Sequence, residues 1–147
     1  MAVALLPITL CAAGGAGLIN VWLAYRSGRT RAAAGGGLGH LDDALLLARS
    51  RSHANFAEYA PIVIILIGAI ELAEGSSVWL SIAAALFLFG RIAHPLGMEN
   101  RFPQGRFIGT IIALLVTSGL ALYALSLPLR ATSVPTPVPV EAPPARG

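Results

Sequence analysis

Residues 51–74 read "RSHANFAEYAPIVIILIGAIELAE", where a polar start containing Arg, His, Asn and Glu gives way to a long apolar run. A helix needs about 20 mostly apolar residues to cross a hydrocarbon core about 30 Å thick, and residues 54–72 meet that requirement. The polar residues before the run would then lie where the helix enters the membrane. Ionisable side chains are costly at that depth, so the stretch predicts both a membrane span and a functional site.

The composition of the whole chain is that of a membrane protein. Of its 147 residues, 56% are hydrophobic and 12% are charged. Four apolar stretches predict spans at residues 2–25, 54–72, 77–92 and 107–127. The first has no basic residue before it and is longer than a signal peptide's apolar core of about 7 to 15 residues, so we expect it to remain a helix. We therefore expect an all-α, integral membrane four-helix bundle over residues 1–127, and a proline-rich, disordered tail over 128–147.

The arginines predict how the chain lies in the membrane. Two connections, between spans one and two and between spans three and four, carry eight of the ten basic residues. These are Arg26, Arg29, Arg31, Arg49, Arg51, Arg91, Arg101 and Arg106. By the positive-inside rule both connections face the cytoplasm, and both termini lie outside it. Topology alone accounts for the net charge of +3, so no nucleic-acid partner is expected.

Local signals predict where the helices begin and end. Residues 26–43, "RSGRTRAAAGGGLGHLDD", predict a flexible glycine-rich loop. Asp42 or Asp43 is expected to cap the next helix, and Gly75 to end it. Pro95 disfavours helix at the preceding residue, so the third helix is expected to end or bend there. Three pairs of small residues have the spacing that lets membrane helices approach closely: Ala13 and Gly17, Ser81 and Ala85, and Gly105 and Gly109.

Polar residues of the second span share one helical face. Arg51, Asn55 and Glu58 are spaced at i, i+4 and i+7, which aligns them over two turns, whereas His53 points elsewhere. One interpretation is that Arg51 and Glu58 pair with charges on a neighbouring helix. The other is that they face the bundle interior or a water-filled cavity and bind a ligand.

Further cations on the same membrane side favour the ligand. Arg91 and His94 end the third span and Arg106 begins the fourth, which is too many cations for one glutamate. Guanidinium groups suit carboxylates, a glutamate suits an ammonium, and an asparagine suits an amide. Glutathione has all of these groups, and a lipid head group fits less well. The chain shows no metal-binding pattern, and its lone Cys11 excludes an internal disulfide.

Three stretches together, "RSHANFAEYAP" (51–61), "GRIAHPLGM" (90–98) and "RFIGT" (106–110), resemble the MAPEG family of membrane-associated proteins in eicosanoid and glutathione metabolism, most closely its small bacterial branch. The resemblance implies a left-handed four-helix bundle that assembles as a homotrimer. It implies that glutathione, the co-substrate, binds between neighbouring subunits near the cytoplasmic face. A bacterial inner membrane is then the expected location.

The resemblance also implies roles for particular residues. Matching positions give the glutathione contacts as Arg51, His53, Asn55, Glu58, Tyr59 and His94, together with one of Arg26, Arg29 and Arg31, for which we take Arg29. Arg106 matches the arginine thought to stabilise the glutathione thiolate, which makes it the catalytic candidate. Met98 departs from the pattern, because many active members have a tyrosine there.

Three classes of function are compatible with the sequence. The first is a glutathione transferase or peroxidase that acts on hydrophobic electrophiles or lipid hydroperoxides arriving from the bilayer. The second is a catalytically silent protein of the same fold with a structural or ligand-binding role, which Met98 favours. The third is a small exporter, for which Glu71 is the one charged candidate inside a span. With Glu74 nearby, Glu71 fits better as the outer end of the second helix.

Overall fold

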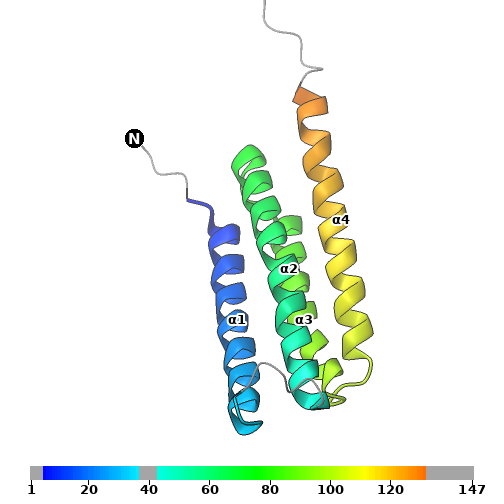
Figure 1. Cartoon of the computed structure of the whole chain (residues 1–147). Helices are drawn as coiled ribbons and strands as arrows, with labels where there is room; N and C mark the ends of the chain where they lie inside the picture. Colours follow the sequence, from blue (N-terminus) through cyan, green and yellow to red (C-terminus); the bar gives the residue numbers. More distant parts are fainter. Residues whose placement is uncertain (1–4, 37–42, 132–147) are drawn as a thin grey trace, which may run out of the picture.

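The computed structural model describes residues 5–36 and 43–131, and within them it contains four helices and no strand. The helices are α1 (Pro7–Ala33), α2 (Ala44–Glu74), α3 (Val78–Met98) and α4 (Gly105–Ala131). They lie side by side as a bundle, and α4 extends beyond the others at its C-terminal end (Figure 1). The predicted all-α four-helix bundle is confirmed.

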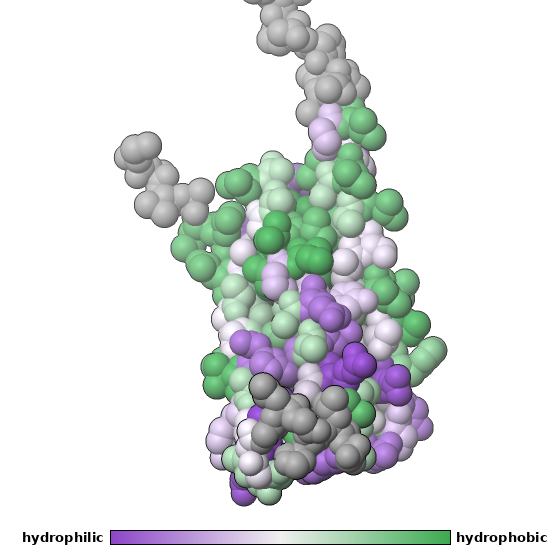
Figure 2. Space-filling model, in the orientation of Figure 1, coloured by the Kyte–Doolittle hydropathy of each residue, from purple (hydrophilic) through white to green (hydrophobic). Residues whose placement is uncertain are grey.

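All four helices are long and apolar enough to cross a membrane. Large apolar side chains cover much of the outside of the bundle, while hydrophilic side chains gather toward the end where α1 stops and α2 starts (Figure 2). Because a bilayer leaves apolar side chains at the protein surface without penalty, this distribution is that of an integral, multi-pass membrane protein.

Helices α2 and α3 lie at the centre of the packing, because each contacts all three other helices. Helix α1 packs chiefly on α2, and α4 chiefly on α3. The core is formed by apolar residues that recur every three or four positions on the facing sides of the helices. Its largest fully buried members are Phe87, Ile67, Ile70, Leu80 and Val63.

Helix α1 is longer than the sequence indicated. It continues to Ala33, so Arg26, Arg29 and Arg31 are helical, and the prediction of a loop from residue 26 is wrong. Alanine and arginine are strong helix formers, and the extension is also fixed by contacts with α2. Thr30 accepts a hydrogen bond from Arg49 at 2.6 Å, and Ser27 shares one with Ser50 at 3.3 Å.

Helix α2 begins and ends as expected. The carboxylate of Asp43 accepts hydrogen bonds from the backbone N–H groups of Leu45 and Leu46, which makes it the N-cap. Asp42 lies outside the described residues. At the other end Gly75 has φ +83, a conformation that favours glycine and stops the helix. The 31 residues of the helix span about 46 Å, which is longer than the hydrocarbon core.

Helix α3 continues through Pro95 to Met98, so it does not end at His94. Close packing on α4 holds this last turn in place. A Cβ on Gly97 would lie 2.0 Å from the backbone nitrogen of Arg106, and one on Gly109 would lie 2.5 Å from the carbonyl oxygen of Gly90. Of the three small-residue pairs, Gly105 and Gly109 therefore form a close helix contact, whereas Gly17 has open space around its Cα.

Helix α4 also passes a proline. The helix runs through Pro128 to Ala131, although the sequence predicted that the helix would end at residue 127. The tail from residue 132 onward lies outside the described residues.

A buried carboxylate joins the outer ends of α1 and α2. Glu71 is 2% exposed and accepts hydrogen bonds from Ile8 N (3.0 Å), Thr9 N (2.8 Å), Thr9 Oγ1 (2.6 Å) and Ser76 Oγ (2.7 Å). The N-cap residue Leu6 has no capping side chain, and Pro7 has no N–H to satisfy. Glu71 therefore caps α1 from another helix and lies in the last turn of α2, close to the end of the helix as the sequence predicted.

Candidate functional site

A cavity of about 600 Å³ opens between α2, α3 and α4 at the hydrophilic end of the bundle. Helix α2 contributes Arg51, Asn55 and Glu58 from successive turns, so the predicted shared face is present. His94 and Met98 line it from α3. The remaining lining residues are Ala44, Leu47, Ala48, Ala54, Arg106 and Thr110. Five of the predicted site residues are thus brought together from three helices.

Three charged side chains face this cavity. Among the described residues, the side chains of Arg51, Glu58 and Arg106 form no hydrogen bond or ion pair with another side chain, and all three residues are exposed. Within the described residues neither Arg51 nor Glu58 forms an ion pair with a neighbouring helix, although the Glu58 carboxylate acts electrostatically on Arg91 of α3. Two cations and one anion face the same space, which gives it a net positive charge.

His94 and Asn55 form the inner wall of the cavity. His94 is 6% exposed, and its Nδ1 has no hydrogen-bond partner among the described residues. Asn55 accepts a hydrogen bond of 2.7 Å from Nη2 of Arg91, which is itself buried in α3. The wall thus offers polar groups at a depth where a ligand's peptide groups could replace water.

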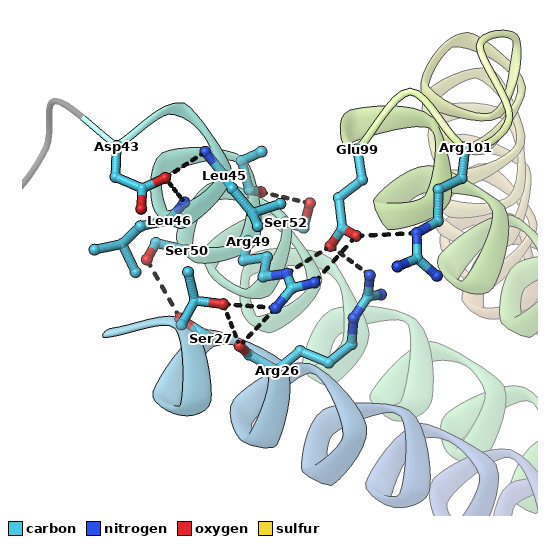
Figure 3. A network of polar contacts seen from close by, with 12 residues as sticks. Arg26, Ser27, Asp43, Leu45, Leu46, Arg49, Ser50, Ser52, Glu99 and Arg101 are labelled. Carbon is cyan, nitrogen blue, oxygen red and sulfur yellow. Dashed lines mark hydrogen bonds and ion pairs between the residues drawn. The ribbon is translucent and has the colours of Figure 1, made fainter. Parts of the chain in front are cut away.

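A separate ion cluster lies beside the site and accounts for several arginines (Figure 3). Glu99, at the end of α3, has a side chain that is 4% exposed and pairs with Arg26 of α1, with Arg49 of α2 and with Arg101. Nε of Arg49 lies 2.9 Å from Glu99 Oε1. Because these arginines already share a carboxylate, the cluster ties three helices together at their inner ends. The sequence analysis did not single out Glu99.

Three predicted site residues lie away from the cavity within this chain. His53 faces α1, where its Nε2 lies 2.9 Å from Oδ1 of Asn20, and it lines a smaller cavity together with Arg31. Arg29 lines a third cavity beside Arg26 and Arg49. Tyr59 faces inward, with its ring centroid 5.5 Å from the guanidinium carbon of Arg91. A single chain therefore does not bring all the predicted contact residues to one cavity.

Thr110 is a cavity residue that the sequence analysis did not select. It follows Arg106 by four positions, so the two share a face of α4, and this spacing was the available signal. Its hydroxyl donates to the carbonyl oxygen of Arg106 at 2.8 Å, which leaves the oxygen able to accept from a ligand.

Another cavity, of about 610 Å³, lies between α1 and α3 at the opposite end of the bundle. It is lined by apolar residues, by hydroxyls such as Ser76 and Ser81, and by Cys11, and by no charged side chain. It has the wrong chemistry for a charged ligand, so the cavity between α2, α3 and α4 is the better candidate site.

The helices and their surface thus define a multi-pass membrane bundle with a cationic cavity at one end. The MAPEG family model matches residues 9–126, which is most of the chain and includes α2, α3 and most of α1 and α4. The chain therefore belongs to the MAPEG family, as the three stretches indicated. No curated protein and no solved structure matches it.

Proposed function

We propose that this protein is a membrane-bound glutathione-dependent transferase or peroxidase that acts on hydrophobic electrophiles or lipid hydroperoxides. The observation that carries the proposal is the convergence of Arg51, Glu58 and Arg106 on one cavity, where none of the three forms a hydrogen bond or ion pair with another side chain among residues 5–36 and 43–131. Membership of the MAPEG family supports a glutathione-related role in general.

Each side chain suits one part of glutathione. Arg51 offers a planar fork of N–H donors to a carboxylate, and Glu58 offers a carboxylate to the α-ammonium. Asn55 offers its amide to a peptide group. The cavity volume of about 600 Å³ is in the range of sites that hold small ligands, about 300–1,000 Å³.

Arg106 is proposed to make the thiol reactive. A thiol with a pKa near 8.5 is mostly protonated at neutral pH, and a nearby guanidinium lowers that pKa because it favours the anion. A shift of about two units requires about 2.7 kcal/mol of differential stabilisation. The sulfur anion then forms a bond to the electrophilic atom of a lipophile, and the leaving group departs with the electron pair.

The separated residues support a site shared between subunits. His53 and Arg29 lie on other faces than the cavity, and several cavity residues are exposed, so a neighbouring copy is proposed to supply His53 and Arg29 in a homotrimer. Coexpression tests this. Arg51→Ala and His53→Ala should each have weak activity when expressed alone. A trimer that contains both variants would have one site with neither substitution, so coexpression should restore activity, and no restoration would contradict a shared site.

The membrane orientation is also a proposal. The arginines gather at the end of the bundle that carries the cavity, so the site is proposed to face the cytoplasm, with both termini outside, in a bacterial inner membrane. The catalytic step would then draw on cytoplasmic glutathione, while its second substrate arrives from the bilayer.

A catalytically silent, ligand-binding protein is the second candidate, because Met98 places a thioether in the cavity where it cannot donate a hydrogen bond. Turnover of 1-chloro-2,4-dinitrobenzene and of cumene hydroperoxide separates the two candidates. We expect Arg106→Ala to reduce turnover at pH 7 by roughly 25-fold, because a thiol pKa that rises from about 6.5 to about 8.5 lowers the thiolate fraction from about 76% to about 3%, and to retain glutathione binding. Arg101→Ala, which removes an exposed arginine outside the cavity, is the matched control. Binding without turnover in the native protein would favour the silent candidate.

A further inference from the structure

Arg91 is a buried cation with one hydrogen-bond partner, Asn55, and the carboxylate of Glu58 is near enough to favour its charge. It is 1% exposed, and its Nη2 donates to Oδ1 of Asn55 at 2.7 Å. Its guanidinium carbon lies 5.5 Å from the ring centroid of Tyr59 and 5.9 Å from that of Phe56. Among the described residues, Nε and Nη1 have no hydrogen-bond partner, and no carboxylate forms an ion pair with this side chain.

This contact determines which way the amide of Asn55 faces. A guanidinium group has only N–H donors, so the amide atom that faces it must be the oxygen. The NH₂ group of Asn55 therefore points the other way. Since Asn55 lines the candidate site and is half-buried, the group left for a ligand is a donor.

We propose that Arg91 is a positioning residue that holds Asn55 so that its Nδ2 offers N–H donors to the cavity. The ligand group bound at this point is then an acceptor, a carbonyl or carboxylate oxygen, and not a peptide N–H. The identity of that ligand as glutathione rests on the proposed function. The orientation of the amide rests on the contact between Arg91 and Asn55 alone.

A purely structural role explains Arg91 less well. A buried cation is costly even where a carboxylate such as Glu58 acts on it without an ion pair, and an apolar side chain of similar volume often stabilises such a position as well or better. The two aromatic rings stabilise the charge in part. The one hydrogen bond that the guanidinium makes within the described residues leads to a residue of the site, so the polar head acts through Asn55.

A double-mutant cycle on glutathione affinity tests the proposal. We expect Arg91→Met and Asn55→Ala each to raise Kd by roughly five- to tenfold, as for the loss of one hydrogen bond. In the Asn55→Ala background, Arg91→Met should have no further effect, because Arg91 acts through Asn55. Arg91→Lys keeps a donor and should restore part of the affinity. An equal effect of Arg91→Met in both backgrounds, or no effect in the native protein, would overturn the proposal.

A second variant separates this inference from the proposed function. Asn55→Asp supplies two acceptor oxygens and no donor, so it should pair with Arg91, raise the thermal midpoint by a few degrees and abolish glutathione binding. With Arg91→Met present, the same aspartate should lower the midpoint, since it is then unpaired. If the native protein binds no glutathione but Asn55→Asp stabilises only beside Arg91, the proposed function fails and the orientation holds. Destabilisation by Asn55→Asp with or without Arg91 would refute the orientation.

Discussion

The cap that Glu71 provides across two helices leads to a sharp prediction about stability. The first turn of α1 has N–H donors at Ile8 and Thr9 that no residue of α1 satisfies, and the Glu71 carboxylate accepts both. Leu10 is already bonded to the carbonyl oxygen of Leu6. In Glu71→Ala, these two half-buried donors lose their acceptor.

The magnitude follows from those two groups. An unsatisfied polar group that is fully buried costs about 1–3 kcal/mol, and these two donors are half-buried, so Glu71→Ala should lower the free energy of unfolding by about 1–3 kcal/mol. The hydroxyls of Thr9 and Ser76 can rotate to other acceptors and add less. Glu71→Gln keeps one carbonyl oxygen and should lose roughly half as much, which keeps the test informative if the alanine variant does not fold.

Unfolding in detergent, followed by circular dichroism, measures this loss, and amide hydrogen exchange of residues 7–12 locates it. Glu74→Gln is the matched control, because Glu74 is an exposed glutamate one turn later that accepts only the hydroxyl of Tyr123. We expect the control to change stability by less than about 1 kcal/mol. An equal loss in Glu71→Ala and Glu74→Gln, or unchanged exchange in the first turn of α1, would refute the capping role.

Two further predictions concern the inner end of the bundle. Glu99→Gln should destabilise the protein by about 3–5 kcal/mol, because it leaves the arginines of α1 and α2 without their shared buried carboxylate. Arg101→Ala should cost less than about 1 kcal/mol, because the side chain of Arg101 is 66% exposed. Thermal midpoints in detergent compare the two variants. Gly97→Ala should prevent close packing of α3 on α4, whereas Gly28→Ala, which has open space, should be neutral or stabilising by roughly 1 kcal/mol; a stable, native-like Gly97→Ala protein would contradict the packing.

Much of the fold was readable from hydrophobic length and local signals. Apolar runs gave the four helices, and Asp43 and Gly75 marked the ends of α2. The ends of α3 and α4 were predicted too early, because the local effect of Pro95 and Pro128 on a helix was considered without tertiary contacts. Pro95 lies in a turn held by the approach of Gly97 to α4, and that contact joins segments that are not adjacent in sequence.

The candidate site could be predicted only in part, because it too depends on contacts between segments that are distant in sequence. The spacing of Arg51, Asn55 and Glu58 fixes a shared helical face whatever surrounds it, and that face lines the cavity. Which side chains come from the other helices depends on how each helix is rotated, which the sequence does not specify. Hence Thr110 was missed, and the cluster around Glu99 was not foreseen. Contributions from His53 and Arg29 depend on a second subunit and stay predictions.

Glutathione binding to the detergent-solubilised protein, measured by calorimetry, tests the central proposal most directly. The native protein should bind saturably, and Arg51→Ala and Glu58→Gln should each weaken binding by roughly 10- to 100-fold, as expected for the loss of a charge-assisted hydrogen bond. Arg101→Ala, outside the cavity, should bind like the native protein. Absence of binding to a well-folded oligomer, or equal affinity in all four proteins, would contradict a glutathione site between α2, α3 and α4.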